Sequence, residues 1–541
     1  MVNKIFILSI SFLIINTVSF PQGGGLIIGN NYRIFPSTTS QSEVFIVNHP
    51  IDNNILFSSA NTLQFTPSFF VSEGIYVSTN QGTSWSGSDT CKGANIFFHG
   101  GDPSIAIDKN GSFIITRKGS SSFPGAYSHY STDNGITWSS QKTISSDDLE
   151  RASIISDTDP TSSTYGRTYL VYALLTPPYP IKFSYTDNIS SSWHSVVAIN
   201  NPTVRGAGGE IAFGPNNEVY VCWAGVSSTS PFTEVQVGFA SSTNGGANWS
   251  VIENAFPMNG IVGILTSKQS IRVNGLPRMA VDLSNTLTRG NIYIVTSQKN
   301  LSPAGSDPDI VLRKSTDGGL SWSNGIRVNQ DVLNNGKTQF FSGITVDDFG
   351  GVNVIFYDDR NTSSDSSGVF LARSTNAGNN WSEYEISDHN FRPSAIGGLG
   401  QGYMGDNIDI TSVGNKLFPV WMDNSSGNYQ IWSVPITIQS VGVDDDAHEL
   451  IPNGFELKQN YPNPFNPNTV IEFSLPQSSD ISLKVFDLTG KEVALLINEF
   501  TEAGNYKINF DAAKLNISSG VYFYHLATNG YSETKPMILL K

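Results

Sequence analysis

The chain has 541 residues, which is enough for one large domain and a smaller one. Only 14% of the residues are charged and the net charge is −15, so nucleic acid and anionic membranes are not expected partners. The two cysteines, Cys91 and Cys222, lie in different parts of the chain, and we expect no disulfide between them. The spacing of Cys and His residues indicates no zinc site, and we predict no metal.

The chain begins with a pattern typical of an export signal. Lys4 precedes an apolar run from Ile5 to Ile15, which is shorter than the about 20 residues that cross a membrane. Thr17 and Ser19 are small enough for a cleavage site. We therefore predict a signal peptide over residues 1–21 and no transmembrane span in the mature chain.

One motif recurs between residues 78 and 381, with the common form S-T-[DN]-x-G-x-x-W. Its five intact copies are STNQGTSW, STDNGITW, STNGGANW, STDGGLSW and STNAGNNW, and a decayed copy ends at Trp193. We expect the Asp or Asn to accept hydrogen bonds from its own turn, the Gly to adopt a positive φ, and the Trp to fill space between sheets. The residues with these structural roles are Asn80, Gly82, Trp85, Asp133, Gly135, Trp138, Asn244, Gly246, Trp249, Asp317, Gly319, Trp322, Asn376, Gly378 and Trp381.

Short alternating strands surround each copy, such as residues 104–108 and 113–117 on either side of a turn. Repeated units with strand-like content predict an all-β fold. We expect a β-propeller over residues 26–438, with one blade formed by each repeated unit. We favour seven blades, because the last unit lacks a fourth strand that residues 26–35 can supply, which closes the ring. Six blades remain the alternative.

The repeated strings resemble the Asp-box, or bacterial neuraminidase repeat, of the sialidase-like propellers. The resemblance covers roughly residues 26–438 and is specific for the fold. It implies less about activity, because Asp boxes also occur in propellers that are not sialidases.

The composition changes after residue 438. Residues 439–452 are predicted to form an acidic linker, in which Asp444, Asp445 and Asp446 are either a calcium site or, as we favour, a solvated run. Residues 453–541 contain alternating strands and turns, and they predict a small antiparallel Ig-like β-sandwich. The strings FELKQNYPNPFNPNT, LKVFDLTGKEV and GVYFYHL closely resemble the C-terminal sorting domain of type IX secretion cargo, with Pro536 as a departure.

The second resemblance implies a route and partners. A type IX outer-membrane translocon recognises such a domain, and a sorting peptidase usually removes it. The product is then released or attached to the outer cell surface.

Propellers bind ligands at the channel mouth, where the inner strands begin. Aligning the predicted inner strands places Glu43, Asp102, Arg151 and Asp406 there as ligand-binding candidates. Loops between second and third strands add three more candidates, which are Asp358, Asp359 and Arg360. The insertion at residues 252–277 is expected to overhang the mouth.

The resemblance to sialidases implies a catalytic set of three arginines, a tyrosine nucleophile with a glutamate partner, and an aspartate acid/base. By position, Glu210, Tyr403 and Arg278 are the candidates, but Gln41 and Ser42 stand where the family has its first arginine. We therefore interpret the protein as a binding propeller, with a glycan or glycoprotein as ligand, and not as an enzyme. An exo-acting glycoside hydrolase, specifically an exo-α-sialidase, is the alternative. No cofactor is predicted, and calcium is left open.

Overall fold

The computed structural model describes residues 25–439, apart from 67–68, 92–98, 121, 231 and 398, and residues 454–540, apart from 502–503, 516 and 529. The predicted signal peptide and Asp444–Asp446 lie outside these residues. The chain separates into two compact units, Met1–Val441 and Gly442–Lys541. In the described parts the only helical segments are two short 3-10 turns, Thr266–Lys268 and Ala512–Leu515, and no helix is long and apolar enough to cross a membrane.

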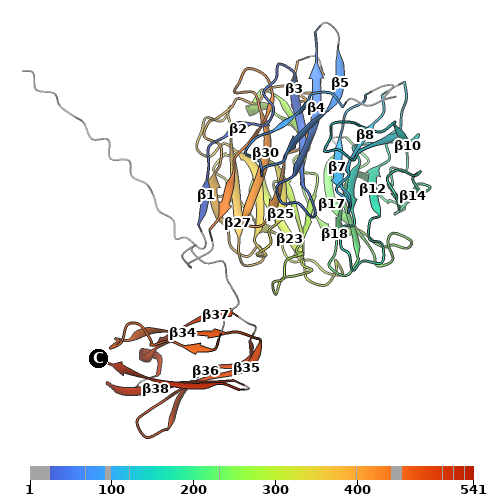
Figure 1. Ribbon diagram of the computed structural model, residues 1–541. Coiled ribbons are helices and arrows are strands. Elements are labelled where there is room, and N and C mark those ends of the chain that lie inside the picture. The colour runs from blue at the N-terminus through green and yellow to red at the C-terminus, as the bar shows by residue number, and fades with distance from the viewer. Residues whose placement is uncertain are drawn as a thin grey trace, which may run out of the picture. The chain divides into compact units, whose positions relative to one another are not determined.

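The larger unit contains seven main antiparallel sheets that follow one another along the chain (Figure 1). The inner strands are β3 (Ser40–Asn48), β7 (Ser104–Ile107), β11 (Ser153–Ser156), β15 (Arg205–Phe213), β21 (Arg278–Val281), β25 (Gln339–Val346) and β29 (Asp409–Val413). The second strands are β4 (Leu56–Gln64), β8 (Phe113–Lys118), β12 (Thr168–Ala173), β16 (Val219–Val226), β22 (Ile292–Gln298), β26 (Val352–Asp358) and β30 (Lys416–Asp423).

The outer half of each sheet holds the third and fourth strands. The third strands are β5 (Phe70–Ser78), β9 (Ala126–Ser131), β13 (Ile181–Thr186), β17 (Glu234–Ser242), β23 (Asp309–Ser315), β27 (Gly368–Ser374) and β31 (Gln430–Ser433). The fourth strands are β6 (Ser86–Ser88), β10 (Lys142–Ser145), β14 (Val197–Ala198), β18 (Ser250–Pro257), β24 (Ile326–Arg327), β28 (Ser382–Glu385) and, in the seventh sheet, β2 (Tyr32–Arg33).

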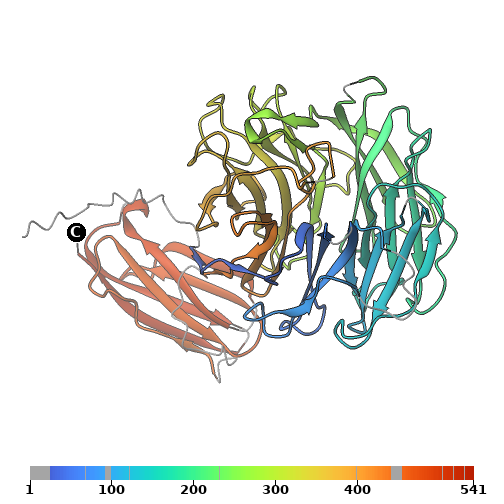
Figure 2. The same cartoon turned by 90° about the horizontal axis from the view of Figure 1, so that it is seen from above.

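The seven sheets form a closed ring. Each inner strand packs against the inner strand of the next sheet, and β29 of the last sheet packs against β3 of the first. In Figure 2 the sheets follow one another round a common centre, from blue through green to orange, and the orange sheet lies beside the blue one. The all-β propeller with seven blades is thereby confirmed.

The N-terminal strands complete the seventh blade. Tyr32 in β2 pairs with Ser433 in β31, which supplies the missing fourth strand. Next to it, β1 (Leu26–Ile28) pairs with β32 (Ile436–Ile438), the last strand of this unit. Pairing the first strands with the last leaves no open seam in the ring, as the sequence predicted.

The repeated motifs form identical turns between third and fourth strands. In all five intact copies the Asp or Asn Oδ1 accepts the N–H four residues later at 2.9 Å. The Ser Oγ accepts the Gly N–H at 2.8–2.9 Å, and each Gly has a φ between 75° and 89°. The ring of Trp322 packs edge-on against Phe239 of the preceding blade at 5.2 Å, so the motif also joins neighbouring sheets.

The hydrophobic core lies between successive blades rather than in one central mass. Leu312, Val354 and Phe356, for example, pack together across the fifth and sixth sheets. Cys91 and Cys222 are both buried and both free.

The smaller unit is a sandwich of two antiparallel sheets. One has β33 (Glu456–Leu457), β34 (Asn468–Leu475) and β37 (Gly504–Asp511), and the other has β36 (Glu492–Thr501), β35 (Ser479–Phe486), β38 (Gly520–Thr528) and β39 (Ser532–Leu539). Phe473, Leu483 and Tyr524 are among the buried residues between them. Pro536 lies in β39, an edge strand, where a missing N–H is tolerated.

Candidate functional site

A cavity of about 520 Å³ opens where the inner strands of the propeller begin. Its lining includes most of the residues that the sequence placed at the mouth. These are Glu43, Asp102, Arg151, Arg278, Tyr403 and Asp406. Glu210, the remaining catalytic candidate, lies below them and lines a smaller cavity of about 160 Å³, to which Arg278 also contributes.

Breaks in the strand register turn side chains into the cavity. The pairing of β3 with β4 shifts between Ser42 and Phe45, and Glu43 inside this shift has a φ of 55°. Similar shifts surround Gly208 in β15 and Phe341 in β25, which have φ values of 63° and 46°. A β-bulge re-aims a side chain and strengthens the local twist, which explains how the inner strands expose polar groups at one end only.

Two arginines form the floor of the cavity. Arg151 Nη2 and Arg278 Nη1 lie 3.6 and 3.5 Å from Glu210 Oε2, and Arg278 Nη2 lies 3.5 Å from Asp409 Oδ1. Both guanidinium groups face the ring of Phe45, at 4.8 and 5.4 Å from its centre. Arg278 is only 7% exposed, and the Nη1 atoms of both arginines are buried without a hydrogen-bond partner among the described residues.

Burial and neighbouring charges shift pKa values at the floor. Burial, and then the charge of Arg278, lowers the pKa of Arg151. Burial also raises the pKa of Asp409 to about 6, so this counter-charge is weakened in mildly acidic solution. Arg151 and Arg278 share Glu210 as a partner and line the cavity together, and guanidinium groups are suited to binding an oxyanion.

One wall carries a hydrogen-bonded group around Asn61. Its Nδ2 donates to Glu43 Oε2 at 3.0 Å and to the Tyr403 hydroxyl at 3.1 Å, and the same hydroxyl lies 3.0 Å from Ser42 Oγ. Burial raises the pKa of Glu43 well above its usual value, and the charges of Asp102 and Asp406 raise it further. Burial, and then Glu43, likewise raises the pKa of Tyr403 well above its usual value.

This wall corrects the predicted pairing of Tyr403 with Glu210. The carboxyl group beside the Tyr403 hydroxyl is Glu43, while Glu210 is paired with the floor arginines. The reason is the bulge in β3, which turns Glu43 toward the mouth. Raised pKa values favour the neutral forms of both groups, and a neutral tyrosine is a weak nucleophile while a neutral carboxyl group is a weak base.

The insertion between blades 4 and 5 forms the opposite side of the cavity. Its start at residue 252 is corrected, because β18 extends to Pro257. It contains a hairpin of β19 (Gly263–Leu265) and β20 (Ile271–Val273), from which Arg272 reaches Asp406 as an ion pair and lies 5.0 Å from the Tyr403 ring centre. Its backbone N–H donates to Gly402 O at 2.9 Å, so the hairpin is attached to the loop before blade 7.

Asp358, Asp359 and Arg360 do not line the cavity, contrary to their predicted place at the mouth. Arg360 turns outward because Asp358 and, on the outer strand β28, Glu383 neutralise it at 2.6 and 2.7 Å. Asp359 instead pairs at 2.5 Å with Lys268 of the insertion, whose side chain is fully buried.

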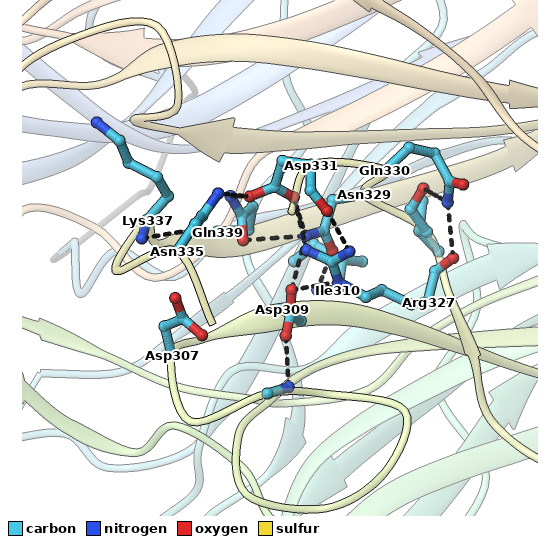
Figure 3. Close-up of polar contacts among 12 residues, drawn as sticks. Asp307, Asp309, Ile310, Arg327, Asn329, Gln330, Asp331, Asn335, Lys337 and Gln339 are labelled. Carbon is cyan, nitrogen blue, oxygen red and sulfur yellow. Dashed lines mark hydrogen bonds and ion pairs between the residues drawn. The ribbon is translucent and has the colours of Figure 1, made fainter. Parts of the chain in front are cut away.

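Near Arg360, residues of blades 5 and 6 form a polar network (Figure 3). Asn329 Nδ2 donates to Asp309, Asp331 and Gln339, and Arg327 pairs with both aspartates at 2.6 and 2.7 Å. Arg360 lies 3.8 Å from Asp331 and so borders the network. Both carboxylates are therefore held by Arg327 and Asn329 within the network. Among the described residues no group of three or more His, Cys, Asp or Glu side chains is arranged to hold a metal ion.

Sequence reasoning missed four charged residues of the lining, which are Glu150, Arg205, Glu234 and Arg272. Glu234 is buried, its carboxylate accepts the Gly275 N–H at 2.8 Å, and burial raises its pKa to about 7. The only signal in the sequence that could have identified Arg272 is its position in the insertion that interrupts the repeat. The other three stand at strand ends with no distinctive motif.

Comparison with known families finds one match in each unit of the chain. A secretion system C-terminal sorting domain matches residues 459–540, and a BNR/Asp-box repeat matches residues 129–140. The C-terminal unit is a type IX secretion sorting domain. The sorting domain indicates a protein that is secreted or attached to the cell surface. A search of curated protein sequences finds no match to the chain.

Solved structures of similar fold share little sequence with the chain. An ulvan lyase bound to -[GlcA(1-4)Rha3S]- is 12% identical with a TM-score of 0.50, and the match covers 76% of this chain and 96% of the lyase. A protein of unknown function from Dyadobacter fermentans is 11% identical with a TM-score of 0.44, covering 77% and 100%. A leech intramolecular trans-sialidase is 13% identical with a TM-score of 0.40, covering 68% and 70%. At such identities the ulvan lyase shares the fold and nothing more is implied.

Proposed function

We propose that this exported propeller binds an acidic saccharide outside the cell, with the acidic group of one sugar on Arg151 and Arg278. The observation that carries the proposal is the pair of buried guanidinium groups in the cavity lining, whose Nη1 atoms make no hydrogen bond among the described residues, Arg278 Nη1 having only the 3.5 Å ion pair with Glu210. A buried donor that lacks a partner costs free energy, and a carboxylate or sulfate accepting from both arginines removes that cost.

The rest of the lining supports a sugar rather than a small inorganic ion. A cavity of about 520 Å³ lies in the range of about 300–1,000 Å³ typical of organic ligands. Glu43, Asp102 and Asp406 surround the space above the arginines, and their carboxyl groups match the paired hydroxyls of a sugar ring. The sorting domain further leads us to expect the type IX translocon and its sorting peptidase as partners during export.

A second candidate is cleavage of the saccharide by an exo-acting glycoside hydrolase, a sialidase in the specific case. It is favoured by Tyr403, whose hydroxyl lies in the cavity next to Glu43. We place it second because burial shifts the pKa of both groups toward the neutral form, and a nucleophilic tyrosine needs a base that takes its proton.

Calorimetric titration of the full chain tests the proposal. The probes are 3′-sialyllactose, tetragalacturonate and a tetrasaccharide of alternating glucuronate and 3-sulfated rhamnose, with neutral cellotetraose for comparison. We expect binding of at least one acidic probe, and a loss of about 100-fold in affinity for Arg278→Gln. Arg289→Gln, at the other end of the same blade, is the matched control and should bind normally. If no acidic probe binds better than cellotetraose, the proposed function is wrong.

The same samples test the second candidate function, cleavage by a glycoside hydrolase. A fluorogenic sialoside is incubated with the wild-type chain and with Tyr403→Phe. Turnover that disappears in the variant supports the hydrolase, and absence of turnover in a wild-type sample that binds sialyllactose excludes it.

A further inference from the structure

The rim of the cavity at blades 3 and 4 carries two aromatic residues in unusual backbone conformations. Tyr179, in the loop between β12 and β13, has a φ of 61°, and Phe232, in the loop between β16 and β17, has a φ of 57°. Bulky side chains rarely occupy this left-handed region, and such residues cluster at functional sites. The two loops are equivalent in neighbouring blades, so the same departure from ordinary geometry occurs twice at one edge of the site.

Arg205 lies between these loops and lines the cavity. Its guanidinium carbon is 4.9 Å from the centre of the Tyr179 ring, and its neighbour Gly206 donates its N–H to Tyr179 O at 3.1 Å. Among the described residues Arg205 has no ion pair and no side-chain hydrogen bond, whereas the other three arginines of the lining each have a carboxylate within 3.6 Å. A guanidinium fixed on an aromatic face keeps its N–H donors free for a ligand.

Phe232 lines the same cavity as Arg205 and is 47% exposed. The nearest carboxylate along its loop, Glu234, also lines the cavity, but both of its oxygens accept the Gly275 N–H. The rim therefore offers an open aromatic ring and an unpaired cation at the edge of a polar cavity. A flat apolar ring suits the face of a pyranose, and a free guanidinium suits an acidic substituent on the same sugar.

We propose that Tyr179, Arg205 and Phe232 form a second saccharide subsite, which takes a second acidic sugar of the same chain. The inference rests on the proposed function, because the first acidic sugar occupies Arg151 and Arg278. Arg205 and Phe232 line the same cavity as Arg151 and Arg278, so the ligand is an oligosaccharide with acidic groups on at least two of its units. A carboxylate and a sulfate present the same oxyanion chemistry, and the probes below separate them.

Affinities for a tetrasaccharide and for its own acidic monosaccharide test this subsite. The probes are tetragalacturonate with galacturonate, and the glucuronate–sulfated rhamnose tetrasaccharide with glucuronate. For whichever tetrasaccharide binds, we expect Arg205→Gln to weaken affinity at least tenfold and Phe232→Ala at least threefold. Neither variant should change the affinity for the monosaccharide, which needs only the floor arginines. Phe349→Ala, an exposed phenylalanine on a turn between first and second strands, is the matched control for Phe232.

The outcomes separate this inference from the proposed function. If Arg205→Gln binds the tetrasaccharide like the wild type, or loses mono- and tetrasaccharide equally, the second subsite is wrong while the floor site stands. If the wild type binds neither acidic tetrasaccharide, the second subsite is wrong too, and the sialyllactose titration alone then decides the floor site. Thermal unfolding of each variant shows whether it is folded. A misfolded Phe232→Ala is replaced by Phe232→Leu, which keeps the bulk and removes the ring.

Discussion

The two faces of the propeller are built on different rules. On the face of the Asp boxes, each turn is held by its own Ser, Asp or Asn and Gly, and five turns have nearly the same hydrogen bonds. On the mouth face the loops share no such motif, and the residues with left-handed backbones include Glu43, Tyr179 and Phe232. Repetition therefore marks where the fold is specified, and its loss marks the face that carries the candidate site.

The largest effect is expected on the regular face. Gly319→Ala places a Cβ 2.0 Å from Phe239 Cε1 and imposes a φ of 89° on an alanine, so we expect a loss of about 4 kcal/mol in the free energy of unfolding. Gly414→Ala is the matched control, because its φ is also positive and nothing lies within 4 Å of its Cβ. That variant should lose about 1 kcal/mol. Chemical denaturation measures both, and equal losses would show that the contact with the preceding blade has no role.

The next effect belongs to the mouth face and depends on pH. Burial raises the pKa of Glu234 to about 7 in the folded chain, against an ordinary value of 4.5. The stability gained from the protonated carboxyl is present below pH 4.5 and is lost as pH rises through 7, up to about 3 kcal/mol. Glu234→Gln keeps an acceptor for the Gly275 N–H and should remove this loss. Denaturation curves at pH 5 and pH 8 that respond alike in both proteins would contradict the prediction.

A smaller pH effect is expected where the ring closes. His389 lies 3.2 Å from Asp423 and packs on Trp432, and the hydrogen bond to Asp423 raises its pKa to about 9. Because the folded pKa is above the ordinary 6.5, this stability is complete below pH 6.5 and disappears as pH rises through 9. The site is half-exposed, so we expect about 1 kcal/mol after screening by solvent. Comparing His389→Gln with the wild type at pH 6 and pH 10 measures it, and the difference should vanish at pH 10.

The smallest effect is expected when Asp and Asn are exchanged in an Asp-box turn. Asp317→Asn puts the residue of three other copies into the fifth blade, where Asn Oδ1 accepts the same N–H. The free energy of unfolding should change by about 0.5 kcal/mol or less. Asp317→Ala, which removes the acceptor, should be clearly less stable in the same assay. A large loss with Asn would mean that the charge, and not the acceptor, holds the turn.

The same contrast explains how much the sequence could reveal. The blades, the closing role of residues 26–35 and the sorting domain follow from short-range patterns whose hydrogen bonds are local. The arginines of the floor could also be predicted from the sequence, because Arg151 and Arg278 stand at the starts of inner strands that the repeat aligns. The pairing of Tyr403 with Glu43 could not be predicted, because it depends on a bulge in β3 for which the sequence gives no signal. Arg360 was misplaced for a related reason, since its neutralising partner Glu383 lies on a different strand.

Closure through β2 has a consequence for the order in which the molecule is assembled. Six blades are made from consecutive stretches of chain and can form as those stretches emerge. The seventh blade forms only when Tyr32 pairs with Ser433. Strand β2 therefore stays unpaired until nearly the whole propeller has been synthesised. Until then the chain is an open arc with two unpaired ends, and Arg278 of the fifth blade lacks its partner Asp409 of the seventh. Ring closure and completion of the site are therefore a single event.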